Sequence, residues 1–184
     1  MKRGQITNII LLLLLALILF TPLGFHVKVW VNRVLSFNPT PVEERKQEIL
    51  SSYTWSLVDR EGRGYNLSQA RGKVVFINIW ASWCPPCVAE MPDLQLLYRD
   101  YNKKVLFLFI ARDRKVKVGA FMEENQYNFP VFYESGPSPV QLSSNSLPTT
   151  YILDRQGRIV VSETGAAAWN SKATRELLDR LVGS

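Results

Sequence analysis

The feature that most constrains this chain is the segment Trp83–Cys87, Trp-Cys-Pro-Pro-Cys, which holds its only two cysteines. Directly before it, Val74–Trp80 is a dense apolar run that predicts a strand buried on both faces. After it, apolar residues recur at helical spacing as far as Tyr101, with Pro92 expected to kink the helix. The chain is therefore expected to place a cysteine pair where a buried strand passes into a helix.

A cysteine at the start of a helix loses its proton easily. Unpaired N–H groups and the helix dipole stabilise an anion there, so Cys84 is expected to form a thiolate more readily than a free cysteine. Pro85 and Pro86 lack an N–H, which makes the N–H of Cys87 the first one available to the Cys84 sulfur. We predict that Cys84 attacks a disulfide and that Cys87 then attacks Cys84 and releases the reduced product. In reverse, the same pair oxidises a dithiol.

Two other uses of the cysteine pair are a zinc half-site and an inert buried pair. A structural zinc normally has four ligands, and the only histidine, His26, stands far from the cysteines in the sequence. A disulfide-stapled secreted scaffold would need more cysteines at distant positions. We therefore expect a redox-active pair with no metal and no cofactor.

Glu90 stands three positions after Cys87, one helical turn further on. A carboxylate there could accept the Cys87 proton during the second step, especially where burial raises its pKa. The alternative is an exposed acidic residue that the dipole at the helix start stabilises. The spacing alone leaves both open.

The N-terminus predicts a membrane anchor over residues 1–25. Lys2 and Arg3 precede an apolar run, Ile9–Phe20, and the wider stretch Ile6–Phe25 is long enough for a short spanning helix. A cleavable signal peptide is the alternative, but no A-x-A-like cleavage site follows Phe20. Because the basic residues stay on the cytoplasmic side, the rest of the chain is expected on the other side of the membrane.

Residues 26–50 are expected to be an interfacial segment and a linker. Hydrophobic residues from Val27 to Leu35 recur at helical spacing, which favours a helix lying in the membrane interface with Trp30 at headgroup level. A continuation of the span and a short strand are the alternatives. The prolines at 39 and 41 and the charged run that follows indicate a spacer.

Residues 51–184 alternate strands and helices, which predicts an α/β domain with a mixed sheet and helices on both faces. Asp154–Gly157 is a hairpin signature, and a helix capped by Asn170 or Ser171 is expected to end the chain. The expected strands are 53–58, 74–80, 105–111, 130–133, 149–153 and 158–161, and the expected helices are 84–101, 115–127 and the last, C-terminal one.

Four segments carry a resemblance to a known family. They are GKVVFINIWASWCPPC at 72–87, Glu90-Met91-Pro92, LPTTYILDRQGRIV at 147–160 and GAAAWNS at 165–171. From about Tyr53 onward the chain resembles the thioredoxin-like proteins of the TlpA/ResA type. Thioredoxins themselves have a buried Asp six positions before the first cysteine, where this chain has Asn78, and the departure fits the extracytoplasmic branch.

The resemblance implies a thioredoxin-like three-layer fold in which Cys84 is the exposed nucleophile and Cys87 resolves. It favours the proton-handling role for Glu90. Pro148 by itself would be assigned a trans bond, as most prolines are, but the resemblance implies a cis bond that faces the disulfide. We accordingly expect the substrate to contact Trp83, Pro85, Leu147 and Pro148.

The resemblance also implies redox partners and a cellular location. Family members act outside the cytoplasm as reductants for cytochrome c or copper-centre assembly and receive electrons from a membrane thiol transporter. We expect protein thiol substrates, such a donor, lipid around the anchor, and a single-pass protein of the cytoplasmic membrane. The net charge of +6 is too small to indicate nucleic acid. A disulfide-forming oxidase or isomerase and a Cu(I) chaperone remain alternative functions.

Overall fold

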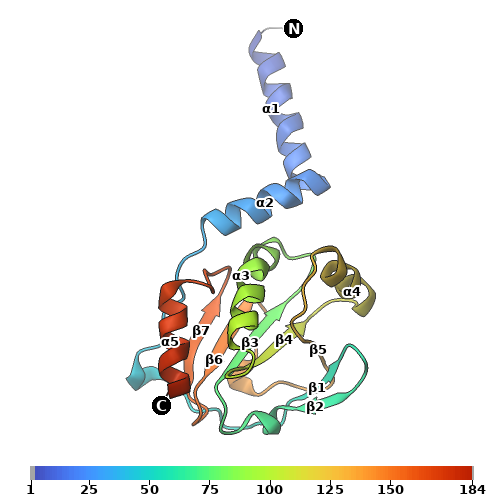
Figure 1. Cartoon of the computed structure of the whole chain (residues 1–184). Helices are drawn as coiled ribbons and strands as arrows, with labels where there is room; N and C mark the ends of the chain where they lie inside the picture. Colours follow the sequence, from blue (N-terminus) through green and yellow to red (C-terminus); the bar gives the residue numbers. More distant parts are fainter. Residues whose placement is uncertain (1–2, 184) are drawn as a thin grey trace.

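The computed structural model describes residues 3–183, without the side chains of residues 3, 6, 17–20 and 22. Two N-terminal helices precede a domain built on one sheet (Figure 1). The α-helices are α1 (Arg3–Phe20), α2 (Pro22–Val34), α3 (Pro85–Tyr101), α4 (Lys115–Glu124) and α5 (Lys172–Gly183). The strands are β1 (Ser56–Asp59), β2 (Gly64–Asn66), β3 (Val75–Trp80), β4 (Leu106–Ala111), β5 (Val131–Glu134), β6 (Thr149–Leu153) and β7 (Ile159–Thr164). Short 3₁₀ helices are η1 (Glu44–Lys46), η2 (Leu67–Ala70) and η3 (Val140–Leu142).

Within residues 3–183 the strands form one mixed sheet of order β2-β1-β5-β4-β3-β6-β7. β3, β4 and β5 are parallel, and the other pairs of neighbours are antiparallel. β3 lies inside the sheet between β4 and β6, and all six of its residues are buried, as its dense apolar sequence predicts. Asn78 of β3 pairs with Thr150 of β6, and this register places both polar side chains on one face.

The distribution of helices differs from the expectation of α-helices on both faces. Buried residues of α3, α4 and α5 all join one hydrophobic cluster with Phe76 and Phe109 of the sheet. The opposite cluster is closed by η2, η3 and the segment Leu50–Trp55. The reason is topological: β3-α3-β4 and β4-α4-β5 cross the sheet in the same direction, and right-handed crossovers then place both helices on the same face.

The N-terminus forms two separate helices. Thr21 ends α1 and caps α2, where its Oγ1 accepts from the N–H of Gly24 at 3.4 Å. Residues 22–34 are therefore neither a strand nor an unbroken continuation of α1. α2 lies across the end of α3, while α1 projects away from the domain (Figure 1).

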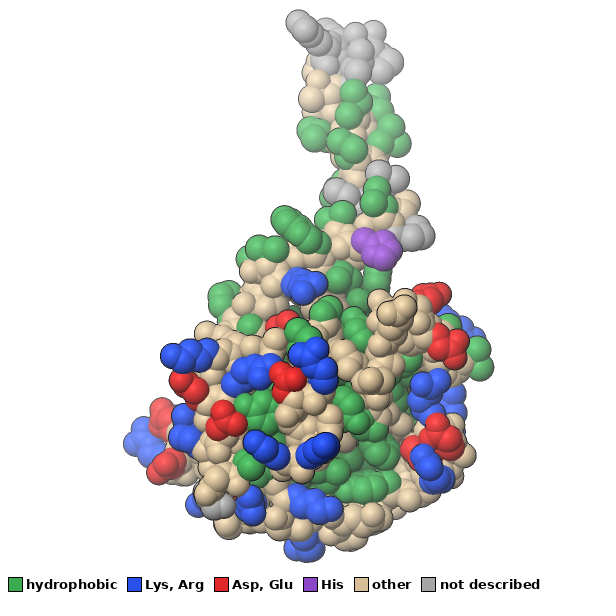
Figure 2. Space-filling view, viewed as in Figure 1, with side chains coloured by type: hydrophobic (Ala, Val, Ile, Leu, Met, Phe, Trp, Pro, Cys, Tyr) green, Lys and Arg blue, Asp and Glu red, His purple; other side chains and the backbone are tan. Residues whose placement is uncertain are grey.

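Over the residues that the structure describes, no helix is long and apolar enough to cross a membrane. The predicted anchor falls partly outside those residues: Met1 and Lys2, and the side chains of residues 3, 6, 17–20 and 22, are not described. In Figure 2, hydrophobic side chains are visible on the described part of α1 and on α2, above a domain surface that carries interspersed basic and acidic groups.

The segment predicted as a linker runs along the edge of the domain. The N–H of Val42 donates to the Val160 carbonyl at 2.9 Å, and the N–H of Leu50 donates to the Gly157 carbonyl at 2.9 Å. Further toward α2, Phe37 pairs with Ala167 in an isolated parallel bridge. The segment between α2 and β1 is therefore hydrogen-bonded to β7 and to the turns at its two ends. The domain boundaries at residues 25 and 50 stay predictions.

Candidate active site

The two cysteines are joined in a disulfide at the start of α3. Cys84 is the N-cap residue, and its Sγ accepts a hydrogen bond from the N–H of Cys87 at 3.3 Å. This is the contact that the two prolines predict, because neither can donate. Cys84 is only 4% exposed, so the expectation of an exposed nucleophile is wrong for the disulfide form, and Cys87 is 0% exposed. The start of α3 thus stabilises negative charge on the Cys84 sulfur and buries Cys87 completely.

The residues around the Cys84 sulfur are the ones expected to contact a substrate. Trp83 is 58% exposed although it is a large aromatic residue. Pro85 is half-buried at the first position of α3. Ser82, the residue before Trp83, donates a 2.5 Å hydrogen bond from its hydroxyl to the carboxylate of Asp113, which follows β4. Trp83 is therefore an exposed residue on a loop that the Ser82–Asp113 hydrogen bond fixes.

The Leu147–Pro148 peptide bond is cis, which confirms what the family resemblance implies. Pro148 directly precedes β6, and Thr149 is paired with Ile79 near the carboxyl end of β3. Cys84 follows that same end of β3, so the proline and the disulfide lie at the same end of the sheet. Pro148 is buried and Leu147 half-buried. The Pro148 carbonyl accepts from the N–H of Gly165 at 2.9 Å.

Glu90 is buried on α3, with 1% exposure. Its Oε1 accepts from Asn78 Nδ2 at 2.8 Å, and its Oε2 accepts from Trp169 Nε1 at 2.7 Å and from the Ala167 N–H at 3.4 Å. The alternative of an exposed acidic residue is therefore wrong. Asn78 Nδ2 also donates to Thr150 Oγ1 at 2.8 Å.

Burial is the largest influence on the proton affinity of Glu90 and raises its pKa to about 8. The hydrogen bonds from Trp169, Asn78 and Ala167 act in the opposite direction, and the nearby charge of Asp93 raises the pKa further. A carboxyl group with a pKa near neutral pH suits an acid–base group better than an ordinary carboxylate does. Glu90 therefore has the environment of a proton acceptor one turn from Cys87.

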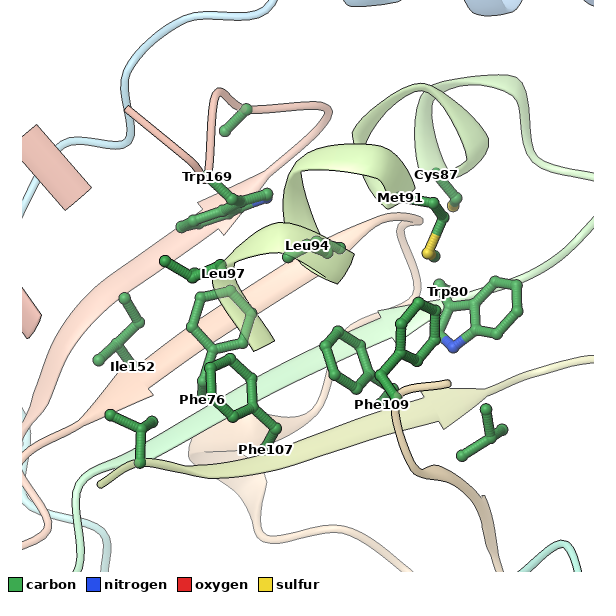
Figure 3. Close-up of a cluster of buried hydrophobic side chains, with 14 of the residues drawn as sticks. Phe76, Trp80, Cys87, Met91, Leu94, Leu97, Phe107, Phe109, Ile152 and Trp169 are labelled. Carbon is green, nitrogen blue, oxygen red and sulfur yellow. The ribbon is translucent and has the colours of Figure 1, made fainter. Parts of the chain in front are cut away.

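The helix that carries the disulfide packs closely against the sheet. Met91, Leu94 and Leu97 point from α3 onto the aromatic side chains of β3 and β4 (Figure 3). Phe76 packs edge-on against Trp169 with 5.2 Å between ring centroids. This packing fixes the face of α3 that carries Cys87 and Glu90.

Sequence reasoning singled out Cys84, Cys87, Glu90 and Pro148, and the structure brings all four to one end of the sheet. It missed Trp169 and the Ala167 N–H as partners of Glu90, and it treated Asn78 only as a departure from thioredoxin. The signal that could have found Trp169 is its place in the segment GAAAWNS, already matched to the family. The roles of these residues in a reaction stay predictions. Across residues 3–183, no group of three or more His, Cys, Asp and Glu could hold a metal ion.

Comparison with known proteins places the chain in a family. Residues 46–178 match the family described as Redoxin. The thioredoxin-like protein YneN of Bacillus subtilis is 31% identical over 137 residues, which cover 72% of this chain and 79% of YneN. The thiol-disulfide oxidoreductase ResA of Bacillus cereus is 33% identical over 107 residues, which cover 56% of this chain and 62% of ResA. The match thus spans less than two thirds of the length of ResA.

The fold has close counterparts among solved structures. A secreted thiol-disulfide isomerase from Corynebacterium glutamicum superposes with a TM-score of 0.60 at 23% identity, covering 78% of this chain and 91% of that one. That similarity establishes the thioredoxin-like α/β fold. Together with the sequence matches, it shows that the chain belongs to the Redoxin family, in its branch of TlpA/ResA-type thioredoxin-like proteins.

Proposed function

We propose that this chain is a thiol–disulfide oxidoreductase that reduces disulfides of partner proteins through Cys84 and Cys87. The observation that carries the proposal is the Cys84–Cys87 disulfide at the first turn of α3, with the buried carboxyl group of Glu90 one turn further on. The ResA relatives are named thiol-disulfide oxidoreductases, which supports disulfide exchange as the activity.

The reaction has two exchange steps. The Cys84 thiolate attacks one sulfur of the partner's disulfide, forms a mixed disulfide and releases the partner's other sulfur as a thiolate. Glu90 then takes the proton from Cys87, whose sulfur attacks Cys84 and expels the partner's remaining thiolate. The partner gains two electrons, and the chain is left with the Cys84–Cys87 disulfide.

An extended partner segment would bind beside the disulfide, at the end of the sheet where β3 ends and β6 begins. The Leu147 backbone precedes the buried Pro148, where it could pair with such a segment, and the exposed ring of Trp83 could cover its side chains. Pro85 completes this contact surface. These four positions are the substrate-binding residues of the proposal.

The alternative functions use the same cysteines. An oxidase or isomerase would run the exchange in the other direction, and the name of the Corynebacterium glutamicum neighbour belongs to that class. A Cu(I) chaperone would hold the ion between the two sulfurs instead of exchanging them. The reductase is favoured over the chaperone because Cys87 is fully buried one helical turn from a buried carboxyl group, the arrangement that the second exchange step needs.

The test of the activity is stoichiometric. The full chain is reduced, mixed with insulin as a protein disulfide, and quenched with acid at intervals. We expect one insulin disulfide to be lost for each Cys84–Cys87 disulfide that forms. The proposal is wrong if the cysteines remain reduced, and the chaperone is favoured if the reduced chain instead binds one Cu(I) tightly.

We further propose that α1 holds the domain at the outer face of the cytoplasmic membrane. The support is the run Ile9–Leu15, whose seven side chains are each 46% to 65% exposed and offer no polar group to water. A helix that is apolar on all sides is suited to lipid. On α2, Trp30 and Val34 are 66% and 62% exposed, as an interfacial helix requires.

Arginine in the middle of α1 is expected to release the chain from membranes. Leu12→Arg with Leu13→Arg places two charges where each costs about 2.5–3.5 kcal/mol on the insertion scale. We expect the variant in the soluble fraction after an alkaline wash, and the matched variant Leu12→Ala with Leu13→Ala in the membrane fraction. Equal distribution of the two variants would contradict the anchor, and N-terminal sequencing would reveal a cleaved segment.

In this position the chain would receive electrons from a membrane thiol donor. The partners would be proteins whose cysteines must stay reduced outside the cytoplasm, such as those that bind haem in cytochrome c or copper. This part of the proposal rests on the family alone.

A further inference from the structure

Residues 165–169, in the loop between β7 and α5, supply two of the three hydrogen bonds to Glu90. Trp169 Nε1 donates to Oε2 at 2.7 Å, and the Ala167 N–H donates to the same oxygen at 3.4 Å. Trp169 is 0% exposed, and its ring is held edge-on against Phe76. The loop therefore fixes one carboxylate oxygen, while Asn78 of β3 fixes the other.

The same loop is held from outside by the segment that follows α2. The Ala168 N–H donates to the Phe37 carbonyl at 2.8 Å. This contact is made by the backbone of Phe37, and the residue as a whole is 78% exposed. Consecutive peptide groups of the loop thus point in different directions: Ala167 donates to the carboxyl group of Glu90, and Ala168 donates to the N-terminal segment.

These donors act on the ionisation of Glu90. Hydrogen bonds to a carboxylate favour the charged form, whereas burial favours the neutral form. Among the ionisable groups around Glu90, Asp93 and Cys87 lie on its own helix. Asn78 and Thr150 from the sheet and Trp169 from the loop are neutral. The contacts from the loop are therefore a main opposing influence to burial, and their loss would keep Glu90 protonated.

We propose that residues 165–169 are a positioning loop for Glu90, with Trp169 as the positioning residue and Phe37 as the point where the N-terminal segment fixes the loop. The inference rests on the proposed function, in which Glu90 takes the Cys87 proton. Cys87 loses its proton to a Glu90 oxygen, its sulfur bonds to Cys84, and the partner sulfur leaves with the bonding electron pair. A loosened loop slows this step by leaving fewer Glu90 side chains ionised.

Trp169→Phe tests the inner contact, because it keeps an aromatic ring and removes the N–H. The measurement is the pH titration of the Glu90 carboxyl carbon by ¹³C NMR in the reduced full chain. We expect the midpoint to rise by about one unit, as the loss of a charge-assisted hydrogen bond implies. The resolving step should be up to about tenfold slower below the midpoint and should approach the wild-type rate at high pH.

An unchanged midpoint in Trp169→Phe would overturn the role of Trp169. If that variant does not fold, β-(3-benzothienyl)alanine introduced at position 169 alone keeps the shape of the indole and lacks its N–H. The same rise in midpoint is expected with it.

Ala168→Pro tests the outer attachment, because it removes the N–H that donates to Phe37. Its matched control is Val42→Pro, which removes a different hydrogen bond of the same segment, the one to Val160. We expect the Glu90 midpoint to rise in Ala168→Pro and to stay at the wild-type value in Val42→Pro. Equal midpoints in the two variants would refute a coupling through Phe37.

The titration separates this inference from the proposed function. If the wild-type chain does not exchange disulfides, the proposed function fails whatever the Glu90 midpoints are. If the chain exchanges disulfides and the midpoints do not move in Trp169→Phe and Ala168→Pro, the proposed function stands and the positioning loop fails.

Discussion

Serine at position 84 is expected to abolish disulfide exchange, whereas serine at position 87 is expected to stop the reaction with the partner bound to Cys84. The difference follows from the first turn of α3. Cys84 caps the helix and accepts the Cys87 N–H at 3.3 Å, so its sulfur is the one stabilised as a thiolate. Cys87 is 0% exposed whereas Cys84 keeps 4% exposure, so the Cys84 sulfur is the one that a partner's disulfide reaches first.

Mass spectrometry of each reduced variant after mixing with an oxidised peptide measures this difference. Cys87→Ser should gain the mass of one peptide half, and Cys84→Ser should gain none. Alkylation of both variants after denaturation controls for the state of the remaining thiol. Adducts of equal yield on Cys87 in Cys84→Ser would show that the two cysteines have no distinct roles.

Glu90→Gln is expected to slow the resolving step about 100-fold, the lower end of what a positioned acid–base group contributes. With a pKa of about 8, Glu90 is mostly neutral at pH 7 and ionised above pH 8. The wild-type rate should therefore rise with pH through this range. In the variant the rise should move to higher pH, where Cys87 ionises without a proton acceptor. Stopped-flow release of a fluorescent peptide from the Cys84 mixed disulfide measures both.

Asp93→Asn is the matched control, since it makes the same chemical change one turn further along α3. It should keep the rise with pH, with a midpoint slightly below that of the wild type, because Asp93 raises the pKa of Glu90. Identical pH profiles for Glu90→Gln and the wild type would exclude Glu90 as the proton acceptor.

The same substitution should alter stability with a definite sign. The pKa of Glu90 is raised on folding, from 4.5 to about 8. The unfolded chain therefore ionises first as pH rises, and stability is full below pH 4.5 and falls until pH 8. Glu90→Gln should remove this fall and be more stable than the wild type by on the order of 3–5 kcal/mol at pH 9, with no difference at pH 4. Urea unfolding at the two pH values gives the comparison.

The regular elements next to the site follow from local patterns, and the sequence predicted them well. The run 74–80 is β3, the prolines after Cys84 begin α3, and the turn at Asp154–Gly157 joins β6 to β7. Other elements differed. The strand expected at 53–58 is β1 (Ser56–Asp59), and the one expected at 158–161 continues to Thr164 as β7. β2 has three residues, too few for a periodic signal. α4 ends at Glu124 instead of Tyr127 because Gln126 has a φ of 56°, a left-handed conformation that cannot continue a helix.

Local sequence patterns could not predict the hydrogen-bond partners of Glu90. Trp169 lies 79 positions from Glu90 and Asn78 lies 12 positions away, and only the closing of the sheet and the packing of α3 bring them together. The contact of Phe37 with the loop has the same origin. It is made by backbone groups, which leave no trace in the identity of the side chains.

The reduction potential of the Cys84–Cys87 pair tests the central claim most directly, because it decides whether the pair gives or takes electrons. Equilibration of the full chain with thioredoxin or glutathione buffers, followed by alkylation and mass analysis, measures it. A reductase is expected to have a potential near that of thioredoxin, roughly −270 mV. A value near −120 mV, typical of a strong oxidant such as DsbA, would contradict the account.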